Sequence, residues 1–285
     1  EFYVRSDCGG ALSSWSGLAG FTTLCSLADV PYFENFDNLI VPETGCYVVS
    51  DDNSDGHQWM SSATFPESFP NSMVIIKNQE LTMDDWFFTP GINLAEGVTY
   101  ALNFNYSREG SGSPDKLEVK WGNSQSVAGM SEVPVWYNND IQSFVYVSGS
   151  ATLTPASTGV YYLGWHGHSV AAQGAVFVDN IRIDVAHLEW NGTFSDDWEE
   201  PANWTPSYVP NEFQDATIPA GTLNYPVIYY SGATCKNLSI GAGAMLMIES
   251  GTEVTIRGNI LIQENGLLNN QGILYLLGNL DNQNN

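Results

Sequence analysis

Oxygen-bearing side chains alternate in one short stretch of the chain, Asp51-x-Asn53-x-Asp55-Gly56. This spacing is the opening half of a calcium-binding loop, because the glycine permits the tight turn that brings alternate oxygens together. The twelfth position of the loop is Ser62 rather than a glutamate, so the bidentate ligand of an EF-hand is missing. The stretch therefore predicts either a Ca²⁺ ligand set of Asp51, Asn53 and Asp55 or a solvated acidic turn.

Two other carboxylates occur among apolar residues. Side chains alternate across a strand, so Asp179 is expected to share a face with Phe177 and Ile181, and Glu34 alternates with aromatic residues in the same way. A buried carboxylate must be protonated, paired or bound to a metal. Because the first and last strands of a sandwich commonly pair, we expect Glu34 and Asp179 to approach each other and share a Ca²⁺ ion. Hydrogen bonds from backbone amides are the alternative.

The charge balance favours a cation as the partner of these groups. Thirty-two Asp and Glu against eight Lys and Arg give a formal net charge of −24, which argues against nucleic acid and anionic membranes as partners. Calcium takes six to eight oxygens, so we expect backbone carbonyls near Asp37 or Asp85 to complete a site. The acidity also suits a secreted protein in a salty medium, where ions screen the self-repulsion.

Patterns for other chemistry are weaker. His166-Gly167-His168 places two imidazoles together, but no third ligand follows nearby and we interpret both as surface histidines rather than a metal pair. The sequence has no nucleophile elbow, no Cys–His pair with a third member, no recognisable hydrolase carboxylates and no glycine-rich phosphate loop. We therefore expect a protein that is not an enzyme.

Tryptophans offer a further kind of binding site. Trp59, Trp136 and Trp165 are candidates for stacking on sugar rings, as jelly-roll domains often do. Most tryptophans in a β-sandwich are core residues instead. The sequence is consistent with both roles for these tryptophans, sugar stacking and core packing.

The elements that must position these residues are β-strands. Aromatic residues make up 13% and charged residues only 14% of the chain, and helical periodicity is absent. Nine short strand patterns in residues 27–186 predict an antiparallel jelly-roll β-sandwich. Short apolar strands with evenly spaced Gly and Asn turns predict a smaller β-solenoid or β-roll in residues 187–285. The expected fold class is all-β.

The cysteines and the beginning of the sequence allow fewer conclusions. We expect a disulfide between Cys8 and Cys25, which bracket one hairpin, and free thiols at Cys46 and Cys235, which fall in different expected domains. No apolar run approaches the length of a membrane span, and the first residues lack a signal-peptide layout. The sequence suggests a piece of a longer exported chain.

Five motifs carry a resemblance to a known family. In their order they resemble the cleaved-adhesin family, which includes the adhesin modules of gingipains and is similar to MAM-type jelly rolls. The resemblance covers about 155 residues and implies a jelly roll with structural Ca²⁺, a role in adhesion and type IX secretion. The proteolytic context of gingipains does not carry over. The motifs are Phe33-Glu34-Asn35-Phe36, the 51–59 stretch, the 85–94 stretch, the 159–165 stretch and Val178-Asp179-Asn180-Ile181.

The flanking segments resemble other modules of surface proteins. Residues 1–26 are similar to the last strands of a fibronectin type III module, and residues 187–285 are similar to tryptophan-led repeats. We expect a secreted bacterial cell-surface adhesin fragment that attaches to a host or environmental glycan or protein, or to copies of itself. The alternatives are a carbohydrate-binding module of a secreted hydrolase and a structural subunit of an extracellular filament or gliding apparatus.

Overall fold

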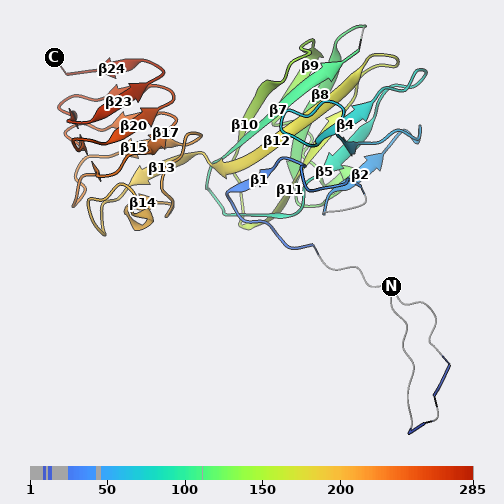
Figure 1. Cartoon of the computed structure of the whole chain (residues 1–285), viewed down its shortest axis with the longest axis horizontal. Coiled ribbons are helices and arrows are strands. Elements are labelled where there is room, and N and C mark those ends of the chain that lie inside the picture. Colours follow the sequence, from blue (N-terminus) through green and yellow to red (C-terminus); the bar gives the residue numbers. More distant parts are fainter. Residues whose placement is uncertain (1–8, 11, 15–24, 43–45, 111, 285) are drawn as a thin grey trace.

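The protein is built from strands arranged in two bodies, a sandwich and a solenoid (Figure 1). The structure is a computed structural model that describes residues 9–10, 12–14, 25–42, 46–110 and 112–284. Within these residues the helical structure consists of two short 3₁₀ helices, Val127–Gly129 and Pro201–Asn203. The all-β prediction is confirmed, as are the sandwich and the solenoid.

The sandwich consists of two antiparallel sheets. In the first sheet the strand order is β10-β7-β12-β4-β3, with β1 also paired to β12; in the second it is β2-β5-β11-β8-β9, with β6 also paired to β11. The first and last strands of the sandwich therefore pair, as expected. The strands of the first sheet are β1 (Tyr32–Glu34), β3 (Met60–Ser62), β4 (Ser72–Ile76), β7 (Tyr100–Glu109), β10 (Val147–Leu153) and β12 (Ala175–Val185). Those of the second are β2 (Val48–Asp51), β5 (Asp85–Phe88), β6 (Ile92–Leu94), β8 (Asp115–Gly122), β9 (Trp136–Ile141) and β11 (Gly159–Gly167).

Aromatic side chains fill the space between the two sheets. The first six residues of β7 alternate between buried and half-buried, which places Leu102 and Phe104 in the core. From the opposite sheet, Phe87 stacks on Trp165 with ring centroids 5.0 Å apart. Phe104 meets the same tryptophan edge-on at 5.7 Å. These ring contacts join the two sheets across the core.

A bulge in β12 changes which face Asp179 occupies. The pairing of β12 with β7 shifts between Asp179 and Arg182, and Asn180 lies in the left-handed region at φ 53°. Val178 before the bulge and Ile181 after it both point into the core. Asp179 therefore lies on the outer side of the sheet, and the prediction that it shares a face with Ile181 is wrong. Simple alternation fails here because the bulge inserts one residue.

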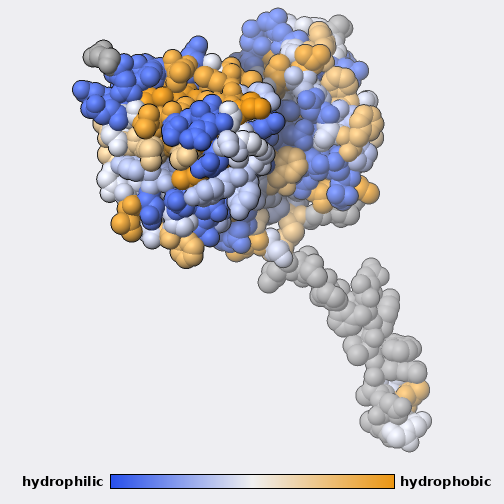
Figure 2. All heavy atoms as spheres, turned by 60° about the vertical axis from the view of Figure 1, so that its left-hand side comes forward, coloured by the Kyte–Doolittle hydropathy of each residue, from blue (hydrophilic) through white to orange (hydrophobic). Residues whose placement is uncertain are grey.

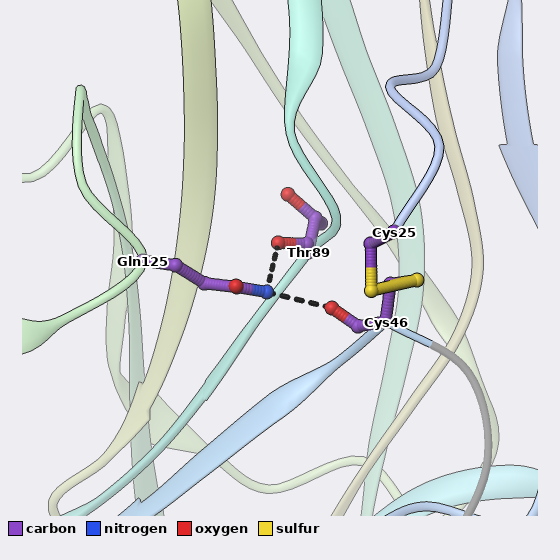
Figure 3. The surroundings of a disulfide bond; sticks show 4 residues. All are labelled: Cys25, Cys46, Thr89 and Gln125. Atoms are coloured by element: carbon purple, nitrogen blue, oxygen red, sulfur yellow. Dashed lines mark hydrogen bonds between the residues drawn. A yellow bond between two sulfur atoms is a disulfide. The ribbon is translucent and has the colours of Figure 1, made fainter. Parts of the chain in front are cut away.

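The observed disulfide joins Cys25 to Cys46, with Cα atoms 5.6 Å apart (Figure 3). The prediction of a free Cys46 is wrong, and so is the pairing of Cys25 with Cys8, a residue that lies outside the described residues. The side-chain amide of Gln125 donates to the carbonyl of Cys46 at 2.7 Å and to that of Thr89 at 2.9 Å. Cys235 is a free, buried thiol, as expected.

The solenoid stacks short strands into three sheets, in which all pairs are parallel except the antiparallel pair of β13 and β14. An asparagine ladder lines one turn of the coils, because the backbone N–H of Asn259 donates to Oδ1 of Asn237 at 2.8 Å and that of Asn279 to Oδ1 of Asn259 at 2.9 Å. One sheet contains β14 (Trp204–Thr205), β13 (His187–Trp190), β15 (Asp215–Ile218), β18 (Leu238–Ile240), β21 (Ile260–Ile262) and β24 (Leu280–Asn282). The second contains β16 (Val227–Ile228), β19 (Met245–Ile248) and β22 (Leu267–Asn270). The third contains β17 (Ala233–Cys235), β20 (Glu253–Ile256) and β23 (Ile273–Leu276).

Asp184, near the end of β12, joins the sandwich to the solenoid. Its side chain is 2% exposed. It accepts hydrogen bonds from Arg182 on its own strand at 2.8 Å, and from Asn211 at 2.9 Å and Gln214 at 2.7 Å in the segment that leads into the solenoid. A buried carboxylate with these charged and amide donors has its desolvation cost offset.

The expected fibronectin-like remnant, residues 1–26, falls largely outside the described residues and stays a prediction. Among the described residues, no helix has the length and apolar character that a membrane crossing requires.

Candidate metal sites

Three carboxylates, Asp51, Asp55 and Asp85, converge at one edge of the second sheet. One ligand oxygen from each lies within 4.8 Å of the others. Asp51 ends β2 and Asp85 begins β5, and the two residues are paired in the antiparallel register of these strands. Asp55 reaches the same point from the loop that follows β2. The pairing of β2 with β5 therefore positions two acids, and the loop supplies the third.

Backbone turns shape the loop from Asp51 to Gly56. Oδ1 of Asp51 accepts the N–H of Asp55 at 3.0 Å, and Oδ2 accepts the N–H of Gly56 at 2.9 Å. Ser54 at φ 57° and Gly56 at φ 83° both adopt left-handed backbone, which the glycine adopts without steric cost. The carboxylate of Asp51 therefore holds the loop in its turn conformation through these two hydrogen bonds, as Asp and Asn side chains do in other turns.

Asn53 connects this loop to the segment before β5. Its side-chain amide donates to the carbonyl of Thr82 at 2.6 Å, and its Oδ1 accepts the N–H of Asp55 at 3.1 Å. Asn53 therefore holds the loop against the strand that carries Asp85. Its predicted role as a direct metal ligand stays a prediction.

Asp85 is the most constrained of the three acids. Its side chain is 0% exposed, and Oδ1 is buried without a hydrogen-bond partner. Burial and, to a smaller extent, the nearby charges of Asp55 and Asp51 together raise the pKa of Asp85 to about 7, while the hydrogen bond from the backbone N–H of Asp84 opposes the shift. A buried carboxylate with an unpartnered oxygen beside two like charges is costly. A bound cation would satisfy that oxygen, and an all-oxygen donor set suits Ca²⁺.

The carboxylate of Asp85 was not among the predicted ligands, because only backbone carbonyls were expected near this residue. The signal was present in Asp85-Trp86-Phe87-Phe88, where alternation places Asp85 on the same face as Phe87. Asp179 alternates with Phe177 in the same way. An acid that alternates with a core aromatic residue was therefore a second candidate.

The pairing of β1 with β12 places Glu34 opposite Ile181 rather than opposite Asp179, and the expected approach of Glu34 to Asp179 stays a prediction. Burial raises the pKa of the Glu34 carboxyl, backbone hydrogen bonds from Phe36 and Asn35 lower it, and the charge of Asp37 raises it. Asp37 also raises the pKa of Asp179. Oδ1 of Asp37 is buried without a hydrogen-bond partner. The charge of Asp37 thus acts on both Glu34 and Asp179.

Asp179 is surrounded by amide donors. Its Oδ2 accepts the backbone N–H groups of Glu67 at 2.9 Å and Ser68 at 3.0 Å, and its Oδ1 accepts that of Asn180 at 2.7 Å. Burial raises the pKa of Asp179 to about 6, although these hydrogen bonds oppose the shift. Both alternatives from the sequence, amide donors and a cation, remain compatible with this geometry. Calcium at Glu34 and Asp179 stays a prediction.

The tryptophans proposed for sugar stacking lie mainly in the core. Trp59 and Trp165 are both 0% exposed, so neither has a face available to a ligand, which corrects that prediction. Trp136 is half-buried and packs edge-on against Phe104 at 4.9 Å and Tyr106 at 4.8 Å. Its role stays a prediction.

The two histidines form a stack rather than a metal pair. His166 lies parallel to Trp86 at 4.1 Å and stacks on His168 at 5.2 Å. Its Nδ1 meets Glu118 at 3.0 Å and its Nε2 meets Asp84 at 2.8 Å. Both ring nitrogens of His166 are therefore already in contact with carboxylates.

The solenoid is similar to one known family of domains. Residues 189–284 match a family described as a domain of unknown function (DUF8693). No curated protein matches the chain.

Several solved structures are similar to the sandwich. The K1 cleaved adhesin domain of Lys-gingipain from Porphyromonas gingivalis is 14% identical, with 55% of this chain and 98% of that chain covered and a TM-score of 0.46. The K3 domain of the same protein is 12% identical over 54% and 98%, at 0.44. The CBM22-1 xylan-binding domain from Paenibacillus barcinonensis is 12% identical over 56% and 97%, at 0.37. The resemblance to cleaved adhesin domains is confirmed as a likeness of fold.

Proposed function

We propose that this chain is a calcium-stabilised, non-catalytic binding module of an exported surface protein. The observation that carries the proposal is the convergence of Asp51, Asp55 and Asp85 within 4.8 Å, with one buried carboxylate oxygen unpartnered. When bound, Ca²⁺ would neutralise three like charges that otherwise repel one another. The pairing of β2 with β5 holds the carboxylates of Asp51 and Asp85 next to each other.

The adhesive role is supported by the five sequence motifs in cleaved-adhesin order. The sandwich would present a surface to a glycan or a protein, and the solenoid would act as a stiff spacer. The junction at Asp184 supports this arrangement, because its buried hydrogen bonds fix the first coil to the last strand of the sandwich. No step of the proposal requires catalysis.

Thermal unfolding tests the calcium part of the proposal. The protein is stripped with a chelator and melted alone, with excess Ca²⁺ and with excess Mg²⁺. A ligand at one hundred times its Kd stabilises the folded state by about 2.7 kcal/mol, which for a domain of this size raises Tm by roughly 5–10 °C. Mg²⁺ should do less, because it prefers a smaller octahedral site and keeps its waters. Equal melting curves in chelator and in Ca²⁺ would overturn the proposal.

Binding to glycan and protein arrays tests the adhesive part. The Ca²⁺-loaded protein should bind at least one class of surface ligand, and binding should weaken after chelation if the metal supports the binding surface. A chain that melts higher with Ca²⁺ but binds nothing would keep the metal site and remove the adhesive role.

A further inference from the structure

Two aromatic side chains lie together at one end of the second sheet and line an open depression of the sandwich. Trp121 in β8 and Tyr161 in β11 stack with ring centroids 5.0 Å apart and an interplanar angle of 26°. Both are half-buried and pack against the core, so part of each ring stays accessible. The depression that they line has a volume of about 510 Å³. This volume lies within the range of roughly 300–1,000 Å³ that is typical of ligand sites.

Uncharged polar groups complete the lining of the depression. Among the described residues, the indole N–H of Trp121 and the exposed side-chain amide of Asn123 have no hydrogen-bond partner. The hydroxyl of Tyr161 donates to the carbonyl of Ser157 at 2.9 Å, and its oxygen can still accept. Ser131 adds a further hydroxyl to the lining. The depression therefore offers an aromatic surface with hydrogen-bonding groups around it.

The loop that borders the depression, residues 122–131, is fixed by its own packing. A Cβ atom on Gly122 would lie 1.8 Å from the carbonyl oxygen of Gly129, so only a glycine permits this close approach. Gln125 ties the same loop to the carbonyl of Cys46, beside the disulfide (Figure 3). A site that is formed before its ligand arrives loses less conformational entropy on binding.

The charge of the lining indicates the chemical class of the ligand. Hydrophilic side chains cover much of the face shown in Figure 2, and the chain has a net charge of −24. None of the described residues that line the depression carries a charge. An anionic ligand would be repelled by the chain as a whole, and a cationic ligand would find no carboxylate on this lining to pair with.

A neutral sugar matches the remaining requirements. The C–H face of a pyranose ring stacks on the face of an aromatic side chain. Its hydroxyl groups both donate and accept, as the hydroxyls of Ser131, Ser157 and Tyr161 do. A peptide is a poorer match, because each peptide group has one fixed donor and one fixed acceptor. Since the depression is open, one sugar unit can occupy it while the rest of a glycan chain continues into solvent.

We propose that the depression beside Trp121 and Tyr161 binds a neutral glycan, with these two rings as the stacking surface and Asn123 and Ser157 as hydrogen-bonding groups. This inference rests on the proposed function, because it names the ligand class and the surface of the same binding module.

The glycan site and the carboxylate cluster lie at opposite ends of β11. Asp85 pairs with Gly167 at one end of this strand, whereas Gly122 pairs with Tyr162 near the other. The Kd for a sugar should therefore be the same in Ca²⁺ and in chelator, at a temperature at which both forms are folded. A Kd that changes tenfold on chelation would place the site beside the metal cluster and overturn the proposal.

Isothermal titration calorimetry of the whole chain with neutral oligosaccharides of xylose, glucose, mannose and galactose tests the ligand class. At least one of these should bind, and an oligosaccharide of galacturonic acid should not, because the acidic chain repels it. Failure of every neutral sugar would overturn the proposal. Binding of a proline-rich peptide in place of the sugars would overturn it as well.

Two variants locate the site. Trp121→Leu should weaken sugar binding by roughly tenfold or more, because leucine keeps an apolar contact with the core but has no flat ring. Asn123→Ala should weaken binding by roughly three- to tenfold and leave the melting curve unchanged, because Asn123 is exposed. Tyr137→Ala is the matched control and should leave the Kd unchanged. Tyr137 is an aromatic residue of β9 that is 64% exposed and does not line the depression.

The outcomes separate this inference from the proposed function. A chain that binds a sugar equally well after Trp121→Leu and Asn123→Ala uses another surface, which overturns the inference and leaves the binding module in place. A chain that binds a protein but no sugar has the same consequence. A chain that binds neither overturns both.

Discussion

Asp51 and Asp85 lie directly opposite each other on the neighbouring antiparallel strands β2 and β5. Like charges in directly opposed positions destabilise a sheet, and Asp55 adds a third carboxylate within 4.8 Å. Trp59 fixes the backbone at this point, because its indole N–H donates to the carbonyl of Asp85 at 3.0 Å. The fold thus holds repelling groups together, an arrangement that a cation would stabilise.

The first prediction concerns Asp85→Asn. Removal of this carboxylate should abolish most of the rise in Tm that Ca²⁺ produces, because the ligand with the buried, unpartnered oxygen becomes neutral. In chelator the variant should be at least as stable as the unaltered chain, since one source of repulsion is gone. Thermal unfolding in chelator and in Ca²⁺ measures both effects.

Asp52→Asn is the matched control for this substitution. Asp52 is exposed and adjacent to Asp51 in sequence, but it is not part of the cluster. The control removes one unit of charge and should keep the response to Ca²⁺. Equal responses of the two variants would show that general acidity, rather than the cluster, binds the ion.

The second prediction concerns the pH dependence of the metal-free chain. The pKa of Asp85 is raised from 3.8 to about 7 in the folded state. Between these values the folded state holds a proton that the unfolded state has lost, so stability is full below about pH 4 and declines as the pH rises toward 7. A shift of this size corresponds to roughly 4 kcal/mol at most.

Urea unfolding in chelator across this pH range measures the effect. Asp179, with a pKa raised to about 6, contributes a decline in the same direction. The difference between the unaltered chain and Asp85→Asn therefore isolates Asp85. In saturating Ca²⁺ the decline should vanish, because the ionised carboxylate is then the stabilised form. A metal-free chain whose stability rises from pH 4 to pH 7 would contradict the prediction.

The strands could be predicted because alternation of apolar and polar residues is a local property of the sequence. The same rule also indicates Asp85, which alternates with Phe87. It failed at Asp179 because the bulge at Asn180 depends on how β12 pairs with β7. These strands are far apart in the sequence, and local alternation carries no information about their pairing. The Cys25–Cys46 disulfide was missed for a related reason, since the path of the chain decides which cysteines meet.

The third prediction concerns the bulge itself. Asn180 adopts φ 53°, a conformation that glycine tolerates and that a β-branched residue strongly disfavours. Asn180→Val should destabilise the sandwich by about 1–2 kcal/mol, whereas Asn180→Gly should change its stability by less. Urea unfolding of both variants provides the comparison. If valine is tolerated as well as glycine, the bulge is not a constraint on the sheet.

The last prediction concerns the junction at Asp184. Asp184→Ala would leave the Arg182 guanidinium and the side-chain amides of Asn211 and Gln214 without their shared acceptor. Loss of one member of a buried charged network costs about 2–4 kcal/mol. Part of that cost should appear as a looser attachment of the solenoid, because two of the three donors lie beyond the sandwich. Small-angle scattering should show a wider range of shapes, and proteases should cut more readily between residues 205 and 214.

Asp140→Ala is the control for this substitution. Asp140 is exposed, and its side chain accepts hydrogen bonds from its near neighbour Gln142. This variant should leave scattering and cleavage unchanged. If Asp184→Ala lowers stability but leaves scattering and cleavage unaltered, the junction is held by the backbone hydrogen bond from Asp215 to Ala186 at 3.0 Å and by the ring of Phe213 under Arg182 at 4.5 Å, rather than by the carboxylate.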